Sequence, residues 1–232
     1  MRLAGYRNIA VLTGAGISRS AGLATYRGPG GLWSDPELAA LSHVDALRAR
    51  RVDVCAMFWR FRDEIRAVAP TAAHRALAAF EAALPTDATF TLVTQNVDGL
   101  HQAAGSRRVV EYHGSLARWR CERCGRDVIP PDGPAPPTCC GEVMRPSAVL
   151  FGEMIPVEAE HAVKRALRDC DLFVAIGTSG TVAPASGFVR SAKYAGARTL
   201  LANLEVADNA RELFDEVQLG EADALVPALF GP

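Results

Sequence analysis

The stretch from Val93 to Gly114, which reads V-T-Q-N-V-D-G-L-H-Q-A-A-G-S-R-R-V-V-E-Y-H-G, decides the fold. It begins at the end of an apolar run, carries amide, carboxylate and imidazole side chains within a few residues, and closes on His113. In open α/β sheets, ligands bind beyond the carboxyl ends of the strands, so Gln95, Asn96 and Asp98 are placed like site residues. The alternative is that these side chains only cap the helix that follows.

The composition is that of an ordinary globular protein. The chain has 232 residues, of which 49% are hydrophobic and 22% charged, which suits one sizeable core with a small additional module. A net charge of −1 argues against a nucleic-acid binder that depends on neutralising phosphates. Met1–Arg7 lacks the apolar core of a signal peptide, and no apolar run approaches the roughly 18 residues that span a bilayer. We therefore expect a cytoplasmic protein without a nucleic-acid or membrane partner.

A glycine turn lies near the N-terminus. Asn8–Leu12 is a short β-branched and apolar run that leads into T-G-A-G-I-S, Thr13–Ser18. A strand, a glycine turn and a helix start form a dinucleotide cradle, because Gly14 and Gly16 let the backbone approach a pyrophosphate. The third glycine of G-x-G-x-x-G is absent, so a tight turn without a ligand also remains open.

The segment Gly22–Trp33 has the composition of a loop, with four glycines, a proline and two large aromatic residues. Arg27, beside Tyr26, is suited to meet a phosphate and to cover a ring. The alternative is a surface loop with an aromatic anchor.

Residues 36–84 show helical periodicity. One apolar stripe, predicted to be buried, recurs at steps of three and four residues: Val54, Met57, Phe58, Phe61, Ile65 and Val68. Trp59 and Arg62 fall off this stripe and share a face, where they either receive an acidic acyl chain or form a solvated edge. His74, in a second helix over 71–84, is expected to pack or to make a cap interaction.

Four of the six cysteines fall between positions 121 and 140. Cys121-x-x-Cys124 and the adjacent Cys139 and Cys140 flank a Pro-rich tract, which is the layout of a structural zinc site. Adjacent cysteines must twist the backbone to direct both sulfurs at one ion. Either the site holds four thiolates, or another ligand or water replaces Cys139.

After the cysteines the chain alternates between strands and helices. A buried strand over Asp171–Ile176 ends in G-T-S-G, which is a second small-residue loop suited to a nucleotide. The alternation predicts an α/β fold, with a Rossmann-like doubly wound parallel sheet and an inserted small zinc-binding domain. We expect the nucleotide-binding domain to comprise 1–118 and 147–232, and the zinc module 119–146, joined by helices from about 30–70.

Several separate motifs, in one order from Asn8 to Pro227, make the chain resemble the sirtuins, the NAD-dependent protein lysine deacylases. The motifs are G-A-G-I-S (14–18), T-Y-R-G (25–28), T-Q-N-V-D (94–98), H-G (113–114), the paired cysteines, F-G-E (151–153), G-T-S (177–179) and N-L-E (203–205).

The resemblance implies NAD and zinc as cofactors, acylated-lysine proteins or peptides as substrates, and nicotinamide and O-acyl-ADP-ribose as products. It implies that Asn96 and Asp98 hold the nicotinamide ribose and carboxamide. His113 would act as general base through the ribose hydroxyls, after the acyl oxygen has attacked C1′ and expelled nicotinamide. The implied NAD site comprises Gly14, Ala15, Gly16, Tyr26, Arg27, Gln95, Asn96, Asp98, Gly177, Thr178, Ser179, Asn203, Glu205 and Ala222.

The peptide would add as a strand between the segments around Val149–Glu153 and Thr181–Ala185. The Gly-rich loop with Trp33, the short N-terminus and Arg62 resemble the subgroup, bacterial members included, that removes succinyl or malonyl groups. In that subgroup a tyrosine stands three residues before the arginine, where this chain has Trp59. We therefore expect deacetylation with a desuccinylase component, and the implied substrate residues are Trp59, Arg62, Val149, Phe151, Gly152, Glu153 and Val182.

Two other functions fit the same residues. A protein mono-ADP-ribosyltransferase would use the same cofactor and much the same site with another acceptor. A catalytically silent interaction module would bind NAD and zinc, but such a module does not require Asn96, Asp98 and His113 together. A monomer is the expected state.

Overall fold

The computed structural model describes residues 5–26, 30–178, 183–205 and 211–231. Its centre is a six-stranded sheet in the order β11-β10-β9-β1-β2-β3, and each neighbouring pair is parallel. The strands are β1 (Asn8–Thr13), β2 (Thr89–Thr94), β3 (Val109–Glu111), β9 (Leu172–Ile176), β10 (Arg198–Asn203) and β11 (Glu216–Leu219). The predicted α/β parallel sheet is therefore confirmed.

Successive residues of the central strand face opposite sides of the sheet, because strand side chains alternate. Ile9 and Val11 of β1 enter one core, whereas Ala10 and Leu12 enter a second core on the other face. Helices cover both faces, which explains why the inner strands read as nearly continuous apolar runs. The first core is closed by α4 (Ala72–Ala83) and α9 (Ala222–Phe230), and the second by α6 (Val157–Arg168) and α7 (Phe188–Tyr194).

The order of strands reverses at β1. The chain moves from β1 to β2 and β3 on one side, and then crosses to β9, β10 and β11 on the other. Such a switch point opens a crevice at the carboxyl ends of the two strands that flank it, here β1 and β9. The glycine loop after β1 leads into the 3₁₀ helix η1 (Ala15–Ala21), and the loop after β9 begins at Gly177.

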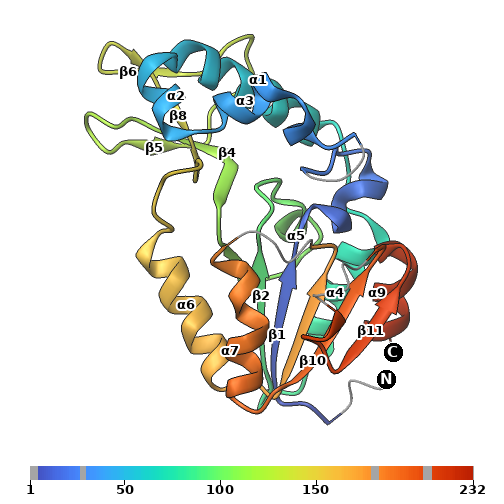
Figure 1. Ribbon diagram of the computed structural model, residues 1–232. Coiled ribbons are helices and arrows are strands. Elements are labelled where there is room, and N and C mark those ends of the chain that lie inside the picture. The colour runs from blue at the N-terminus through green and yellow to red at the C-terminus, as the bar shows by residue number, and fades with distance from the viewer. Residues whose placement is uncertain (1–4, 27–29, 179–182, 206–210, 232) are drawn as a thin grey trace.

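A third core forms a smaller unit at the top of Figure 1. It joins helices that precede the central stretch with strands that follow it: α1 (Pro36–Leu41), α2 (Val44–Ala49), α3 (Arg51–Arg66), β4 (Gly114–Arg120) and β8 (Arg145–Ala148). β5 (Asp127–Val128) pairs with β4, and β6 (Thr138–Cys139) with β7 (Glu142–Val143) make a separate hairpin. The remaining short elements are η2 (Leu32–Ser34), α5 (Leu100–Ala103) and η3 (Ala185–Gly187).

The helical periodicity of the sequence predicts α4 correctly but only part of the buried surface of α3. His74 completes a capping box with Thr71 at the start of α4, so its predicted cap interaction is confirmed. In α3, however, Trp59 and Arg62 are 4% and 3% exposed, although the single apolar stripe predicted them to lie off the buried face. The reason is that α3 lies between two layers, because the Pro-rich tract covers the face that the pattern left to solvent. Among the described residues, no helix is both long and apolar enough to cross a bilayer.

Candidate active site

A cavity of about 850 Å³ opens at the switch point, between the loops that follow β1 and β9. Two backbone hydrogen bonds hold these loops together, from Gly14 N to Ile176 O (3.0 Å) and from Gly16 N to Gly177 O (2.9 Å). A Cβ on Gly16 would lie 2.7 Å from the Cα of Gly177, and one on Gly14 would lie 2.8 Å from Gly177 O. Only glycine fits at either position, so the cavity floor is bare backbone of the kind that approaches a pyrophosphate.

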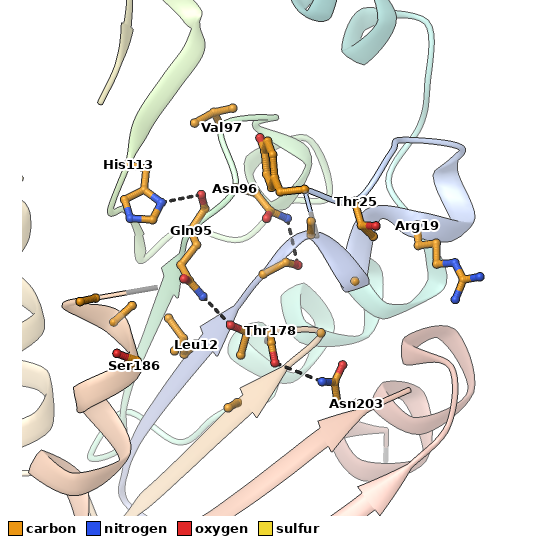
Figure 2. Close-up of a pocket in the computed structure, with 18 of the residues that line it drawn as sticks. Leu12, Arg19, Thr25, Gln95, Asn96, Val97, His113, Thr178, Ser186 and Asn203 are labelled. Atoms are coloured by element: carbon orange, nitrogen blue, oxygen red, sulfur yellow. Dashed lines mark hydrogen bonds between the residues drawn. The ribbon is translucent and has the colours of Figure 1, made fainter. Parts of the chain in front are cut away.

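Polar side chains from three loops meet over this floor. Gln95 Nε2 donates to Thr178 Oγ1 (2.8 Å), and Asn203 Nδ2 donates to the backbone carbonyl of Thr178 (3.1 Å). Together with the contact between His113 and Gln95, these bonds run across the site in Figure 2. Residues that are far apart in the sequence are therefore joined on one cavity wall.

The hydrogen bonds of Asn96 leave one of its polar atoms, Oδ1, without a partner among the described residues. Its Nδ2 donates to Gly14 O and to Ser18 Oγ, both at 3.2 Å. Its Oδ1 is buried and has no hydrogen-bond partner in the part of the chain that the structure describes. Because buried polar atoms are nearly always paired, an unpaired oxygen on a cavity wall fits a ligand that donates a hydrogen bond.

Asp98 lies behind this wall. Its Oδ2 accepts from Ser18 Oγ (2.7 Å), and its Oδ1 accepts from the Leu100 amide at the start of α5 (3.0 Å). One oxygen therefore does serve the following helix, as the simpler interpretation of the sequence held. The other orients Ser18, which in turn contacts Asn96.

His113 is part of the cavity wall and follows β3. Its Nδ1 lies 3.1 Å from Gln95 O, and because a carbonyl can only accept, Nδ1 carries the proton and Nε2 is left to take one. Burial lowers the pKa of His113 below its ordinary value, and the bond to the Gln95 carbonyl opposes this shift only in part. The imidazole is therefore neutral near pH 7, as a general base must be.

Most of the predicted site residues line the cavity. They are Gly14, Ala15, Gly16, Tyr26, Gln95, Asn96, His113, Val149, Phe151, Gly152, Glu153, Gly177, Thr178, Asn203, Glu205 and Ala222. Arg27, Ser179 and Val182 lie outside the described residues. The sequence interpretation missed Arg19, Trp33, Ser42 and Phe58, which also line the cavity, because no local pattern separates them from ordinary core or surface positions.

Trp59 and Arg62, which the sequence placed among the acyl-binding residues, are not among the residues that line the cavity. The Arg62 guanidinium donates to Pro130 O (3.0 Å), pairs with Asp63, and lies 4.3 Å from the centre of the Trp59 ring. Trp59 Nε1 donates to Gly133 O (3.1 Å). Both side chains therefore hold the Pro-rich tract onto α3. Phe58, one residue earlier, faces the cavity instead.

The four clustered cysteines fit a zinc ion. The Sγ atoms of Cys121, Cys124, Cys139 and Cys140 all lie within 4.8 Å of one another. A tetrahedral zinc with bonds of about 2.3 Å separates its sulfurs by about 3.8 Å, and the distances 124–139 and 139–140 are 3.7 and 3.8 Å. Cys140 has φ = 52°, which is the backbone twist that lets two adjacent cysteines face one point. This geometry favours the four-thiolate alternative, and none of the four cysteines lines the cavity.

Comparisons with known proteins agree with this geometry. The model of the Sir2 family matches residues 14–184. The NAD-dependent protein deacylase of Pasteurella multocida is 41% identical over 94% of each chain, and NAD-dependent protein deacylase 2 of Pyrobaculum aerophilum is 43% identical over 88% of this chain and 82% of its own.

Two solved structures extend the likeness to three dimensions. A complex of a Sir2 homolog with NAD has a TM-score of 0.88 at 32% identity, covering 98% of this chain and 89% of the other. A complex described as Sir2-p53 peptide-NAD+ has a TM-score of 0.80 at 25% identity, covering 97% and 92%. This chain therefore belongs to the Sir2 family, the sirtuins that its motifs resemble.

Proposed function

We propose that this chain is an NAD-dependent protein lysine deacylase, which transfers an acyl group from a lysine side chain to ADP-ribose and releases nicotinamide. One observation carries the proposal: a bare glycine floor, a buried unpaired amide oxygen and a neutral imidazole meet in one cavity. Relatives that match over most of the chain carry the name NAD-dependent protein deacylase.

Each group has a role that its surroundings support. When bound, NAD supplies a glycosidic bond whose cleavage leaves ADP-ribose able to accept the acyl group. Gly14, Gly16 and Gly177 would let the backbone approach its phosphates, and Asn96 Oδ1 would accept from its nicotinamide end. His113 Nε2 would take a proton from a ribose hydroxyl. The acyl-lysine peptide would pair with the segment Val149–Gly152, which forms part of the same wall.

Products identified by mass spectrometry test the proposal. Incubation with NAD and acyl-lysine peptides should yield free lysine peptide, nicotinamide and O-acyl-ADP-ribose in equal amounts. ADP-ribose attached to protein would instead support a mono-ADP-ribosyltransferase, and retained NAD without any product would support a silent binding module.

The acyl group that the cavity favours is neutral. Phe58 lines the cavity and packs against Phe61 at 6.0 Å between ring centres. The Arg62 guanidinium instead donates a hydrogen bond to Pro130 O and forms an ion pair with Asp63. We therefore expect acetyl-lysine to exceed succinyl-lysine in kcat/KM by about tenfold or more. Arg62→Gln should lower the melting temperature but leave that ratio unchanged, in peptide assays with both substrates. A selective loss of succinyl turnover would restore the acidic-acyl interpretation.

Phe58→Ala provides the matched comparison, because it changes the neighbouring side chain that does face the cavity. Removal of the ring enlarges the wall, so butyryl-lysine turnover should rise relative to acetyl-lysine by about tenfold. The same ratio should not move in Arg62→Gln.

The rate of deacylation should fall in acid only at a pH below the usual pKa of histidine. A base must be unprotonated, and burial lowers the pKa of His113. As pH falls, the rate should therefore hold past about 6.5, the usual imidazole value, and decline only at lower pH. The measurement is kcat/KM for an acetyl-lysine peptide from pH 5 to 8 with NAD saturating. A decline centred above 6.5 would contradict the assigned state of His113.

We further propose that the domains divide as the sequence indicates, into 1–118 with 147–232 and a zinc module over 119–146 that packs with helices of 30–70. The third core supports a small unit that packs α1–α3 against the cysteine module, and it also includes Leu116, Ala148 and Leu150, which lie just outside 119–146. We also propose a cytoplasmic monomer that binds no nucleic acid. A net charge of −1 supports the lack of nucleic-acid binding, and four clustered cysteines without disulfides support the cytoplasmic location.

A further inference from the structure

Arg145 is a charged side chain that is wholly buried, with 0% of its surface exposed. It begins β8, directly after the cysteine module, and its guanidinium remains ionised in proteins. Glu153 meets it with both oxygens, Oε1 at 2.5 Å from Nη1 and Oε2 at 2.8 Å from Nη2. This two-bond geometry fixes the relative orientation of the two side chains as well as neutralising the charge.

The pair closes a loop of backbone between its two members. Arg145 Nη2 also donates to Ala148 O (2.9 Å), and Glu153 Oε2 also accepts from the Leu150 amide (2.8 Å). Residues 148–153 are therefore folded around the ion pair, and all six line the cavity. Burial disfavours ionisation of Glu153, but the hydrogen bond and charge of Arg145 and the Leu150 amide outweigh it, so the pKa of Glu153 stays below its usual value.

This segment is also tied to the catalytic histidine and to the small unit. The Val149 amide donates to His113 O (2.8 Å), the Phe151 amide donates to Ser42 O (3.0 Å), and the Val44 amide donates to Phe151 O (2.9 Å). Both oxygens of Glu153, which the sequence placed among the substrate residues, are therefore engaged with Arg145. Its contribution to the cavity is the position of the backbone before it.

A second acid extends the ion pair into the cysteine module. Glu122, between Cys121 and Cys124, accepts from Arg145 Nη1 (3.3 Å) with Oε1 and from Arg51 Nη1 (2.8 Å) with Oε2. Arg51 Nε in turn donates to Val143 O (2.8 Å). A continuous chain of charges therefore runs from α3 through the first cysteine pair to the cavity wall.

We propose that Arg145 is a positioning residue for the peptide substrate: with Glu153 it fixes segment 149–152, and through Glu122 it ties that segment to the cysteine module. The inference rests on the proposed deacylase function. It follows that loss of the ion pair impairs the binding of acyl-lysine peptide and spares that of NAD, since none of these contacts involves the glycine floor.

Three variants test the proposal. Glu153→Gln removes the negative charge but keeps the shape of the side chain, Arg145→Lys keeps the positive charge but cannot make both hydrogen bonds to Glu153, and Glu122→Gln removes the charge of the second acid. We expect KM for an acetyl-lysine peptide to rise about tenfold or more in Glu153→Gln, less in Arg145→Lys and least in Glu122→Gln, with KM for NAD within about twofold of wild type. Arg118→Lys is the matched control, because Arg118 in the same sheet pairs with Asp127 on the surface. Its peptide KM should not change.

Direct binding separates this inference from the proposed function. The dissociation constant of a fluorescent acetyl-lysine peptide, measured by anisotropy with ADP-ribose present, requires no turnover and should show the same order of variants. A wild type that binds the peptide but forms no O-acyl-ADP-ribose would defeat the proposed function alone. Unchanged peptide affinity in folded Glu153→Gln, or an equal rise in both KM values, would overturn the positioning role. If Glu153→Gln does not fold, Arg145→Lys, which retains the buried charge, decides by the same criteria.

Discussion

His113→Ala should lower kcat for deacylation by about 10²- to 10⁴-fold, which is the range that a positioned general base contributes. Nδ1 of His113 is hydrogen-bonded to Gln95 O, so Nε2 is the atom that accepts the proton, and the substitution removes it. The base acts on a ribose hydroxyl rather than on the phosphates, so NAD affinity should change by less than about threefold. The two measurements are steady-state formation of O-acyl-ADP-ribose and calorimetric titration with NAD.

His161→Ala is the control for this variant. His161 lies exposed on α6 and does not line the cavity, so kcat should stay at the wild-type value. A His113→Ala enzyme that keeps more than about a tenth of the wild-type kcat would mean that another group takes the proton.

Gly16→Ala should raise the Kd for NAD by about 100-fold or more. The added Cβ would lie 2.7 Å from Gly177 Cα and 2.9 Å from Gly177 O, and both are backbone atoms that cannot rotate away. The loops after β1 and β9 would have to separate, which breaks the bond from Gly16 N to Gly177 O and widens the floor on which the pyrophosphate lies. Calorimetric titration with NAD measures the effect.

Gly187→Ala gives the reference for this substitution, because a Cβ there would meet nothing within 4 Å and its φ of −85° suits any residue. Its NAD affinity should equal that of wild type. If Gly16→Ala binds NAD as tightly as Gly187→Ala does, the glycine floor is not where the cofactor lies.

The sequence predicts the sheet and the cavity well because both follow from local patterns. The strands are short apolar runs, and Gly14, Gln95 and Gly177 stand directly after them, where parallel strands bring their ends together. It fails at Arg62 because helical periodicity identifies one buried face, and α3 has two. Phe58 was assigned to the core stripe, and nothing in its spacing shows that the stripe ends at a cavity.

Side-chain networks were also beyond the sequence. Arg145, Glu122 and Glu153 are separated by 8 to 31 positions in a region that shows no periodicity. Only the antiparallel pairing of β4 with β8 brings the first cysteine pair beside the start of β8. Glu153 was predicted among the substrate residues, and it does line the cavity, but no pattern in the sequence shows its two hydrogen bonds to Arg145.

The position of β1 in the middle of the sheet has a consequence for synthesis of the chain. β1 leaves the ribosome well before β9, which pairs with one of its edges and begins only at Leu172. At about 5–20 residues per second, that edge waits on the order of ten to thirty seconds for its partner. An unpaired apolar edge can template association with other chains, so the nascent protein is most vulnerable to aggregation, and most dependent on chaperones, between the emergence of β1 and that of β9.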